Sequence, residues 1–256
     1  MSSNIYPALA IRPPRFAEMD FLWLSMWVAF LLVFGLTPHH ADFMVWTLVG
    51  GGVLVFEHLY SVVYKGEAPQ GNLMLAAVMP LFLAITGLAL TIVNRLTPVT
   101  HDALLMRLDL GIASHVRSWS IIMGAMPPLR LVYDAIPLFM ATGLAAFRGT
   151  ERKRLLLAVI VGGLVCPICF FLFPAVGPVH VGDSLAPRNC MPSMHFTWTL
   201  LLLAYSQGTW RWFFGVIAFL TAWATLATGE HYSLDLVAAV LFTWGITVLV
   251  NRLEGK

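Results

Sequence analysis

Residues 192–235 read PSMHFTWTLLLLAYSQGTWRWFFGVIAFLTAWATLATGEHYSLD and decide how the rest of the chain is interpreted. The stretch begins with PSMH and ends with HYSLD, and mostly apolar residues lie between these two polar motifs. Two apolar helices would carry the chain across an apolar phase and back, which predicts that both motifs lie at the same face of a helical bundle. Three side chains suited to catalysis are thereby expected to meet: His195, His231 and Asp235.

The composition is that of a membrane protein. Of the 256 residues, 59% are hydrophobic and 11% are charged, whereas soluble domains carry about 25% charged residues. A transmembrane helix needs about 20 apolar residues. Eight apolar runs approach that length: 21–37, 43–64, 73–93, 129–147, 155–176, 193–207, 212–228 and 232–250. We therefore expect an all-α, polytopic integral membrane helical bundle with about eight transmembrane helices.

The chain is expected to form one domain with a short leader. Residues 1–20 are polar and are predicted to be a cytoplasmic N-terminal tail, and residues 21–256 a single integral membrane catalytic domain.

The distribution of Lys and Arg predicts the topology. If all eight runs cross, ten of the 15 Lys and Arg residues lie on the cytoplasmic side, four on the other side and one within a run. Cytoplasmic loops carry an excess of these residues, so both motifs are expected on the non-cytoplasmic face, of the plasma or inner membrane if the source is bacterial. The net charge of +2 is too small to suggest a nucleic-acid partner.

The two motifs contain the parts of a phosphoryl-transfer site. His231 and Asp235 are four residues apart, so on a helix they share one face. The carboxylate can accept the proton-bearing nitrogen of the imidazole and leave the other nitrogen free to attack. His195 is suited to protonate a departing oxygen as a general acid. Ser193, together with free N–H groups at helix N-termini, is suited to hold a phosphate.

These residues resemble signatures of the type 2 phosphatidic acid phosphatase superfamily. PSMH is similar to its second signature, Pro-Ser-x-His, and HYSLD is similar to the third signature as written in one branch, His-Tyr-x-x-Asp. That branch contains inositol phosphorylceramide synthase and sphingomyelin synthase. The resemblance is specific within residues 174–240, and it implies a phosphatidic-acid-phosphatase-type core with His231 as nucleophile, Asp235 as its orienting carboxylate and His195 as the acid.

The chain also departs from the phosphatase pattern. That pattern has Ser-Arg where this chain has Ala224 and Thr225, and no Lys-x6-Arg-Pro first signature is present. The synthase branch also lacks this arginine, so the departure favours that branch. A phosphate without arginine loses its bidentate partner, and the replacement cations are predicted to be Arg188 and Arg130, the latter with Asp134 one helical turn away.

Three functions remain open from the sequence. The first is a lipid phosphotransferase resembling inositol phosphorylceramide synthase, which passes a phosphate-containing headgroup to a hydroxyl acceptor through a phosphohistidine. The second is a lipid phosphate phosphatase that uses water and acts on phosphatidyl or polyprenyl phosphates. The third is a non-catalytic membrane transporter or scaffold. We expect a lipid substrate and the bilayer as partners, no cofactor and no metal, and the sequence leaves donor, acceptor and oligomeric state open.

Two further features carry weaker signals. Cys190 is a single thiol for which the sequence offers no evident partner. Residues 95–128 contain the amphipathic stretch Asp102–Leu110, which is expected to lie along the membrane interface. The whole segment 95–128 is a hypothetical gate for lipid entry.

Overall fold

The computed structural model describes residues 51–63 except 53, 57 and 61, and residues 85–255 except 184 and 185. All regular secondary structure in these ranges is helical. The labelled helices are α4 (Asp102–Leu108), α5 (Ile112–Ile122), α6 (Met126–Asp134), α7 (Ile136–Ala146), α8 (Gly149–Leu172), the short 3-10 helix η2 (Pro178–His180), α9 (Met194–Tyr205), α10 (Thr209–Thr228) and α11 (Ser233–Leu253). A further apolar helix covers Ile85–Leu96. The all-helical prediction is confirmed for the described residues.

Some predicted segments cannot be compared with the structure. The cytoplasmic tail 1–20 and the first run 21–37 lie outside the described residues, and the runs 43–64 and 73–93 lie only partly within them. The other five runs each coincide with one helix or with a pair of helices. The count of eight transmembrane helices therefore stays a prediction.

Within the described residues, three helices are long and apolar enough to cross a membrane: α8, α10 and α11. The pair α6 and α7 would make a fourth span, although the two helices are bent by 53° at Ala135. Pro137 explains this break, because proline has no N–H to donate to the carbonyl four residues earlier and its ring collides with that carbonyl. These apolar helices support an integral membrane protein.

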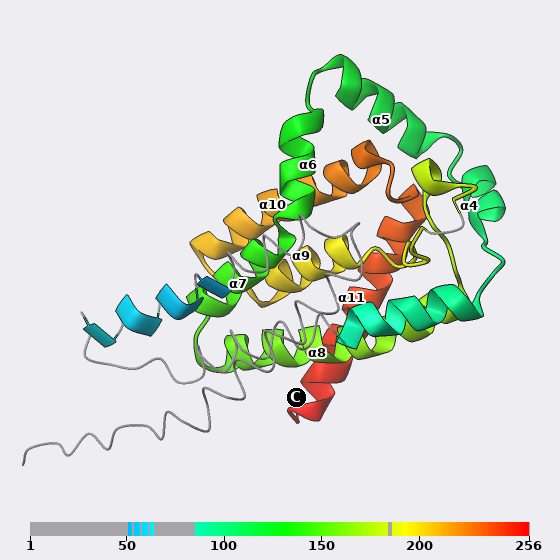
Figure 1. Cartoon of the computed structure of the whole chain (residues 1–256). Helices are drawn as coiled ribbons and strands as arrows, with labels where there is room; N and C mark the ends of the chain where they lie inside the picture. The colour runs from blue at the N-terminus through cyan, green and yellow to red at the C-terminus, as the bar shows by residue number, and fades with distance from the viewer. Residues whose placement is uncertain are drawn as a thin grey trace, which may run out of the picture.

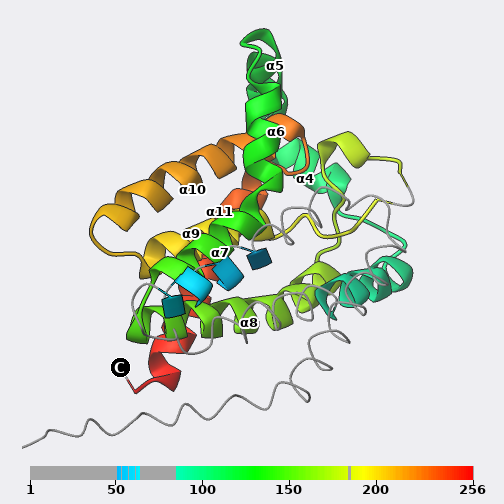
Figure 2. The same cartoon turned by 60° about the vertical axis from the view of Figure 1, so that its left-hand side comes forward.

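The short helix α9 is the centre of the bundle. It packs against α7, α8, α10 and α11, and both views show it enclosed by them (Figures 1 and 2). Leu201 and Leu202 of α9 are fully buried. Gly143 of α7 permits the close approach, since a Cβ there would lie 2.2 Å from a Leu202 methyl carbon. The N-terminus of α9, which carries the first motif, is thus held by packing on several sides.

The predicted amphipathic stretch begins as a helix and then turns. The helix α4 covers Asp102–Leu108, and the chain then passes through Leu110 and Gly111, both with positive φ, before α5 begins. In Figure 1, α4 and α5 lie beside the end of the bundle where α10 and α11 are joined. This places residues 102–122 close to the second motif.

Candidate active site

The second motif lies on a tight turn between two long apolar helices. Helix α10 ends at Thr228, and Gly229 follows in the left-handed conformation with φ +79°. Glycine adopts this conformation without steric cost and commonly ends a helix in this way. Only three residues separate Gly229 from the first residue of α11, Ser233. One of them is His231, which is therefore fixed at the end of the bundle.

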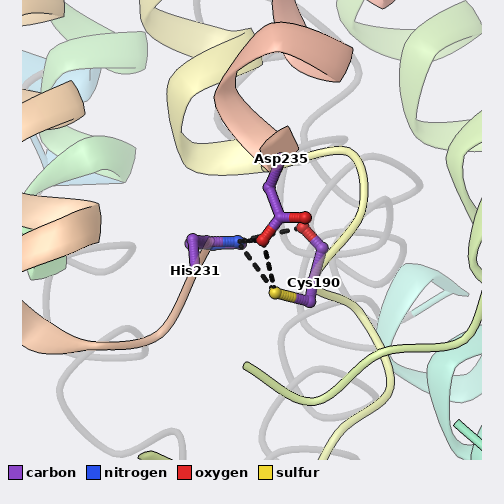
Figure 3. A group of neighbouring side chains, drawn as sticks. All are labelled: Cys190, His231 and Asp235. Atoms are coloured by element: carbon purple, nitrogen blue, oxygen red, sulfur yellow. Dashed lines mark hydrogen bonds and ion pairs between the residues drawn. The ribbon is translucent and has the colours of Figure 1, made fainter. Parts of the chain in front are cut away.

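His231 and Asp235 lie next to each other, as their spacing predicts. The Nδ1 atom of His231 lies 3.3 Å from Oδ2 of Asp235 and 2.9 Å from the carbonyl oxygen of Cys190. Both oxygens are acceptors, so Nδ1 carries the proton and Nε2 holds the free lone pair. Figure 3 shows the three side chains converging from the α8–α9 loop, the α10–α11 turn and the first turn of α11. The arrangement leaves the lone pair of Nε2 free, as the predicted nucleophilic role requires.

The Asp235 carboxylate is fully buried and is held by several donors. Its Oδ2 atom accepts the backbone N–H of Tyr232 at 2.7 Å and the thiol of Cys190 at 2.7 Å, besides facing His231. The contact with Tyr232 is half of a capping box at the N-terminus of α11. The Oδ1 atom, also buried, has no hydrogen-bond partner in the described part of the chain. The carboxylate is thus oriented by the helix start and by the loop before α9.

Cys190, for which the sequence predicted no partner, belongs to the site. Its Sγ atom donates to Asp235 and lies 3.4 Å from Nδ1 of His231. Burial raises the pKa of the thiol well above its usual value, and the charge of Asp235 and the hydrogen bond to it raise that pKa further. Cys190 is therefore a neutral donor at physiological pH. No spacing rule signals this contact, because the thiol belongs to a loop without regular structure.

Cys190, His231 and Asp235 together also form a potential metal-ligand group, with ligand atoms within 4.8 Å of one another. In the present arrangement Sγ and Oδ2 are 2.7 Å apart, which is a hydrogen-bond distance. Two such ligands of a tetrahedral zinc ion lie about 3.5 Å apart, and the thiol must first lose its proton. The three side chains therefore fit a hydrogen-bonded cluster better than a metal site.

His195 lies across from His231. It is the second residue of α9, and its ring centroid is 6.3 Å from that of His231. The ring stacks on Tyr133 of α6 with 4.0 Å between centroids. The prediction that the two motifs meet at one end of the bundle is therefore matched by the geometry. Tyr133, which supports His195 from a helix outside both motifs, was not predicted.

Ser193 is the N-cap of α9. Its side-chain oxygen accepts the N–H of Phe196 at 3.5 Å, and its own N–H donates to the backbone carbonyl of Asp235 at 3.3 Å. The residue is fully buried. The structure thus shows a capping role and a direct link between the two motifs, and a phosphate contact stays a prediction.

Arg130 lies near the site but is engaged by carboxylates. Its Nε donates to Asp134 at 3.0 Å, its Nη1 donates to Glu230 at 3.3 Å, and its guanidinium lies over the Tyr133 ring. Glu230 also pairs with His180 at 2.9 Å. The predicted pair with Asp134 is present, and Glu230 offsets the charge of Arg130 further.

Arg188 presents the opposite case. Only 7% of its surface is exposed, and its Nε atom is buried without a hydrogen-bond partner. Among the described residues no carboxylate pairs with it; its recorded contact is through the backbone N–H, which donates to Asn94 at 2.7 Å. It lies two residues before Cys190, in the loop that contacts His231. A buried cation without an anion is costly, which distinguishes Arg188 from the paired Arg130, and a phosphate contact by either arginine stays a prediction.

A third arginine, which the sequence analysis did not single out, reaches the turn. Nη1 of Arg117 on α5 donates to the carbonyl oxygens of Thr228 and Ala227 at the end of α10. A cation at a helix C-terminus satisfies carbonyls that lack partners and interacts favourably with the helix dipole. Arg117 thereby helps to fix the turn that carries His231.

The comparison with protein families supports the resemblance drawn from the motifs. A family model described as the PAP2 superfamily matches residues 180–249, which include His195, His231 and Asp235. The searches of curated proteins and of solved structures gave no significant match. The family match supports the type 2 phosphatidic acid phosphatase superfamily. Together with the apolar helices, it supports a membrane protein with a lipid phosphatase or phosphotransferase type of function.

Gly177 provides a test of how tightly the α8–α9 loop packs on the turn. Its φ is +90°, and a Cβ would lie 2.2 Å from the carbonyl oxygen of Glu230. We expect Gly177→Ala to displace the residue next to His231 and to reduce activity at least about tenfold. Gly182→Ala is the matched control, because its φ is +91° but, among the described residues other than its chain neighbours, no atom lies within 4 Å of the added Cβ. Equal losses in the two variants, measured by turnover and by melting temperature in detergent, would contradict a specific packing role.

The Cys190 thiol provides a second test. In a Cys166→Ala/Cys169→Ala variant, we expect iodoacetamide at about pH 7.5 to leave Cys190 unmodified in the folded protein and to modify it after unfolding in SDS, because thiolate is the reactive form. Because the pKa of the folded thiol is raised, the unfolded thiol ionises first as the pH rises. Stability should therefore fall above the unfolded pKa of about 9. Full modification of the folded protein, measured by mass spectrometry, would contradict the buried neutral thiol.

Proposed function

We propose that this protein is a membrane phosphotransferase that moves a phosphate-containing lipid headgroup to a hydroxyl acceptor through a phosphohistidine at His231. The observation that supports this most directly is the pair of imidazoles with ring centroids 6.3 Å apart. One ring has its Nδ1 engaged by a buried carboxylate and a carbonyl, and the other begins the neighbouring helix. A phosphoryl group between them would meet a nucleophile on one side and a proton donor on the other.

The first half-reaction forms the phosphohistidine. Nε2 of His231 attacks phosphorus while the bond from phosphorus to the lipid oxygen breaks. Protonated His195 gives its proton to that oxygen, so the lipid leaves as a neutral alcohol. Asp235 stabilises the positive charge that develops on the imidazole of His231.

The second half-reaction releases the group. His195, now neutral, takes the proton from the acceptor hydroxyl as its oxygen attacks phosphorus. The bond from phosphorus to Nε2 breaks, and His231 returns to its starting state. With a hydroxyl acceptor the product is a new phosphodiester or headgroup-bearing lipid. With water as acceptor, the same steps hydrolyse the donor.

The identity of the acceptor separates two candidate functions. Thr225 occupies the position where the phosphatase signature has arginine, and this favours the transferase that resembles inositol phosphorylceramide synthase. The family match spans phosphatases as well, so a lipid phosphate phosphatase is the second candidate. In either case the lipid and the bilayer are the partners, and we place the site at the non-cytoplasmic face.

The deciding experiment follows ³²P from a mixed pool of lipid donors with the purified protein in detergent. We expect label in a new lipid or headgroup product only when a hydroxyl acceptor is added, and none with His231→Ala. Label released as inorganic phosphate without an acceptor would support the phosphatase instead. If no label moves in a manner dependent on His231, the protein is a non-catalytic transporter or scaffold and the proposal is wrong.

Arg188 offers a separate test of the phosphate subsite. Because the Arg188 side chain is buried and no carboxylate among the described residues pairs with it, Arg188→Met should raise the melting temperature of the substrate-free protein by about 2–4 °C, which corresponds to about 1 kcal/mol. The same change should lower turnover by about 100-fold and remove stabilisation by added inorganic phosphate. Arg211→Met, at an exposed position within the first turn of α10, is the control. Unchanged turnover in Arg188→Met would rule out this arginine as the phosphate partner.

A further inference from the structure

Two buried carboxylates next to the site have no part in the reaction described so far. Asp102 of α4 and Asp109, which follows that helix, are 2% and 3% exposed. In the part of the chain that the structure describes, neither carboxylate forms an ion pair. Burying a carboxylate is costly unless hydrogen bonds compensate it. The donors that satisfy these two groups therefore indicate what they hold in place.

Asp102 joins the two chain segments that flank the catalytic pair. Its carboxylate accepts the backbone N–H groups of Val176 and Gly177 at 3.1 Å each, and the hydroxyl of Tyr232 at 3.1 Å. Tyr232 directly follows His231. Burial and the charge of Asp102 raise the pKa of the Tyr232 hydroxyl, so this group stays protonated and donates. One side chain thus fixes the start of the α8–α9 loop and the residue beside the nucleophile.

Asp109 holds the next residue along the turn. Its Oδ1 atom accepts both the backbone N–H and the hydroxyl of Ser233, each at 2.6 Å. Its Oδ2 atom accepts the N–H of Ala113 in the first turn of α5 at 2.9 Å. Ser233 is the first residue of α11, on which Asp235 lies. The carboxylate therefore anchors the helix start that orients Asp235.

Apolar packing joins the same groups. Leu105 of α4 is 1% exposed and forms a buried cluster with Ala175, Cys190 and Tyr232. Cys190 is the residue whose thiol and carbonyl contact Asp235 and His231. The helix α4 thus lies directly against the loop and the turn that supply the catalytic pair, although it is outside residues 180–249 matched by the family model.

We infer that Asp102 and Asp109 are positioning residues for the proposed transfer reaction, and that α4 is a fixed part of the active site. This inference rests on the proposed function. The two carboxylates hold Tyr232 and Ser233, which directly follow His231. Because α10 ends just before His231, the backbone on both sides of this residue is fixed, and so is the orientation of its imidazole. A misplacement of a reacting group by about 1 Å can cost about 100-fold in rate. Neither carboxylate needs to touch the substrate to have this effect.

Additional anchors oppose the hypothesis that residues 95–128 open as a gate. Arg117 of α5 donates to the last carbonyls of α10, and Nε1 of Trp223 on α10 donates to Ser120 of α5 at 2.8 Å. With Asp102 and Asp109, these contacts tie α4 and α5 to the C-terminal part of α10 and to the start of α11. Opening this segment would break buried hydrogen bonds next to the nucleophile.

The test uses variants that remove one acceptor or one donor. Asp102→Asn and Asp109→Asn keep the shape of the side chain, whereas Tyr232→Phe and Ser233→Ala remove only the partner hydroxyl. We expect phosphohistidine formation in single-turnover assays to slow by about 10- to 100-fold in the Asn variants and less in the hydroxyl variants. The KM for the lipid donor should change by less than about threefold. Each double variant, such as Asp102→Asn/Tyr232→Phe, should be no slower than its Asn parent, because the two substitutions disrupt the same hydrogen bond.

Two controls separate positioning from folding and from the proposed function itself. Glu151→Gln lies at the opposite end of α8 from the site, where Glu151 pairs with Gln207, and should match the wild type. A slower single-turnover step at saturating donor, with an unchanged KM and an unchanged melting temperature, is the signature of positioning, because unfolding would lower the melting temperature. Unchanged single-turnover rates in all four variants, with an active wild type, would overturn this inference alone. An inactive wild type would instead refute the proposed function.

Discussion

The buried carboxylate of Asp235 is the group on which the rest of the site depends. A charge without access to solvent must be compensated by hydrogen bonds, and its donors come from separate segments: the imidazole of His231, the thiol of Cys190 and the backbone N–H of Tyr232. The backbone carbonyl of Asp235 also accepts the N–H of Ser193. One residue at the start of α11 therefore links both motifs and the α8–α9 loop.

The charges around this centre are distributed unevenly. Arg130 is neutralised by Asp134 and Glu230, whereas Arg188 is buried two residues from Cys190 without a recorded carboxylate partner among the described residues. In the proposed reaction, the phosphate of the substrate would supply the missing anion. Packing of α9 within the bundle keeps the arrangement rigid, because the helix that carries His195 is surrounded by four others.

The sequence predicted those features that depend on short spacings or on composition. Apolar runs predicted the helices α8 to α11, and the four-residue interval predicted the contact between His231 and Asp235. The bend between α6 and α7 was not predicted, although Pro137 could have signalled it. Asp102 was read as part of an interfacial helix, because a single amphipathic stretch does not reveal that its carboxylate is satisfied by a hydroxyl 130 positions away.

The sequence by itself determined the all-helical fold class, the position of the two motifs at one end of the bundle and the contact between His231 and Asp235. These follow from local periodicity and from the need of apolar helices to cross a membrane and return. Only the tertiary structure decided which groups surround the pair: the Cys190 thiol, the Tyr133 ring and the Asp109 carboxylate. Such partners are chosen by the packing of helices far apart in the chain, because buried donors and acceptors must find each other wherever the bundle brings them together.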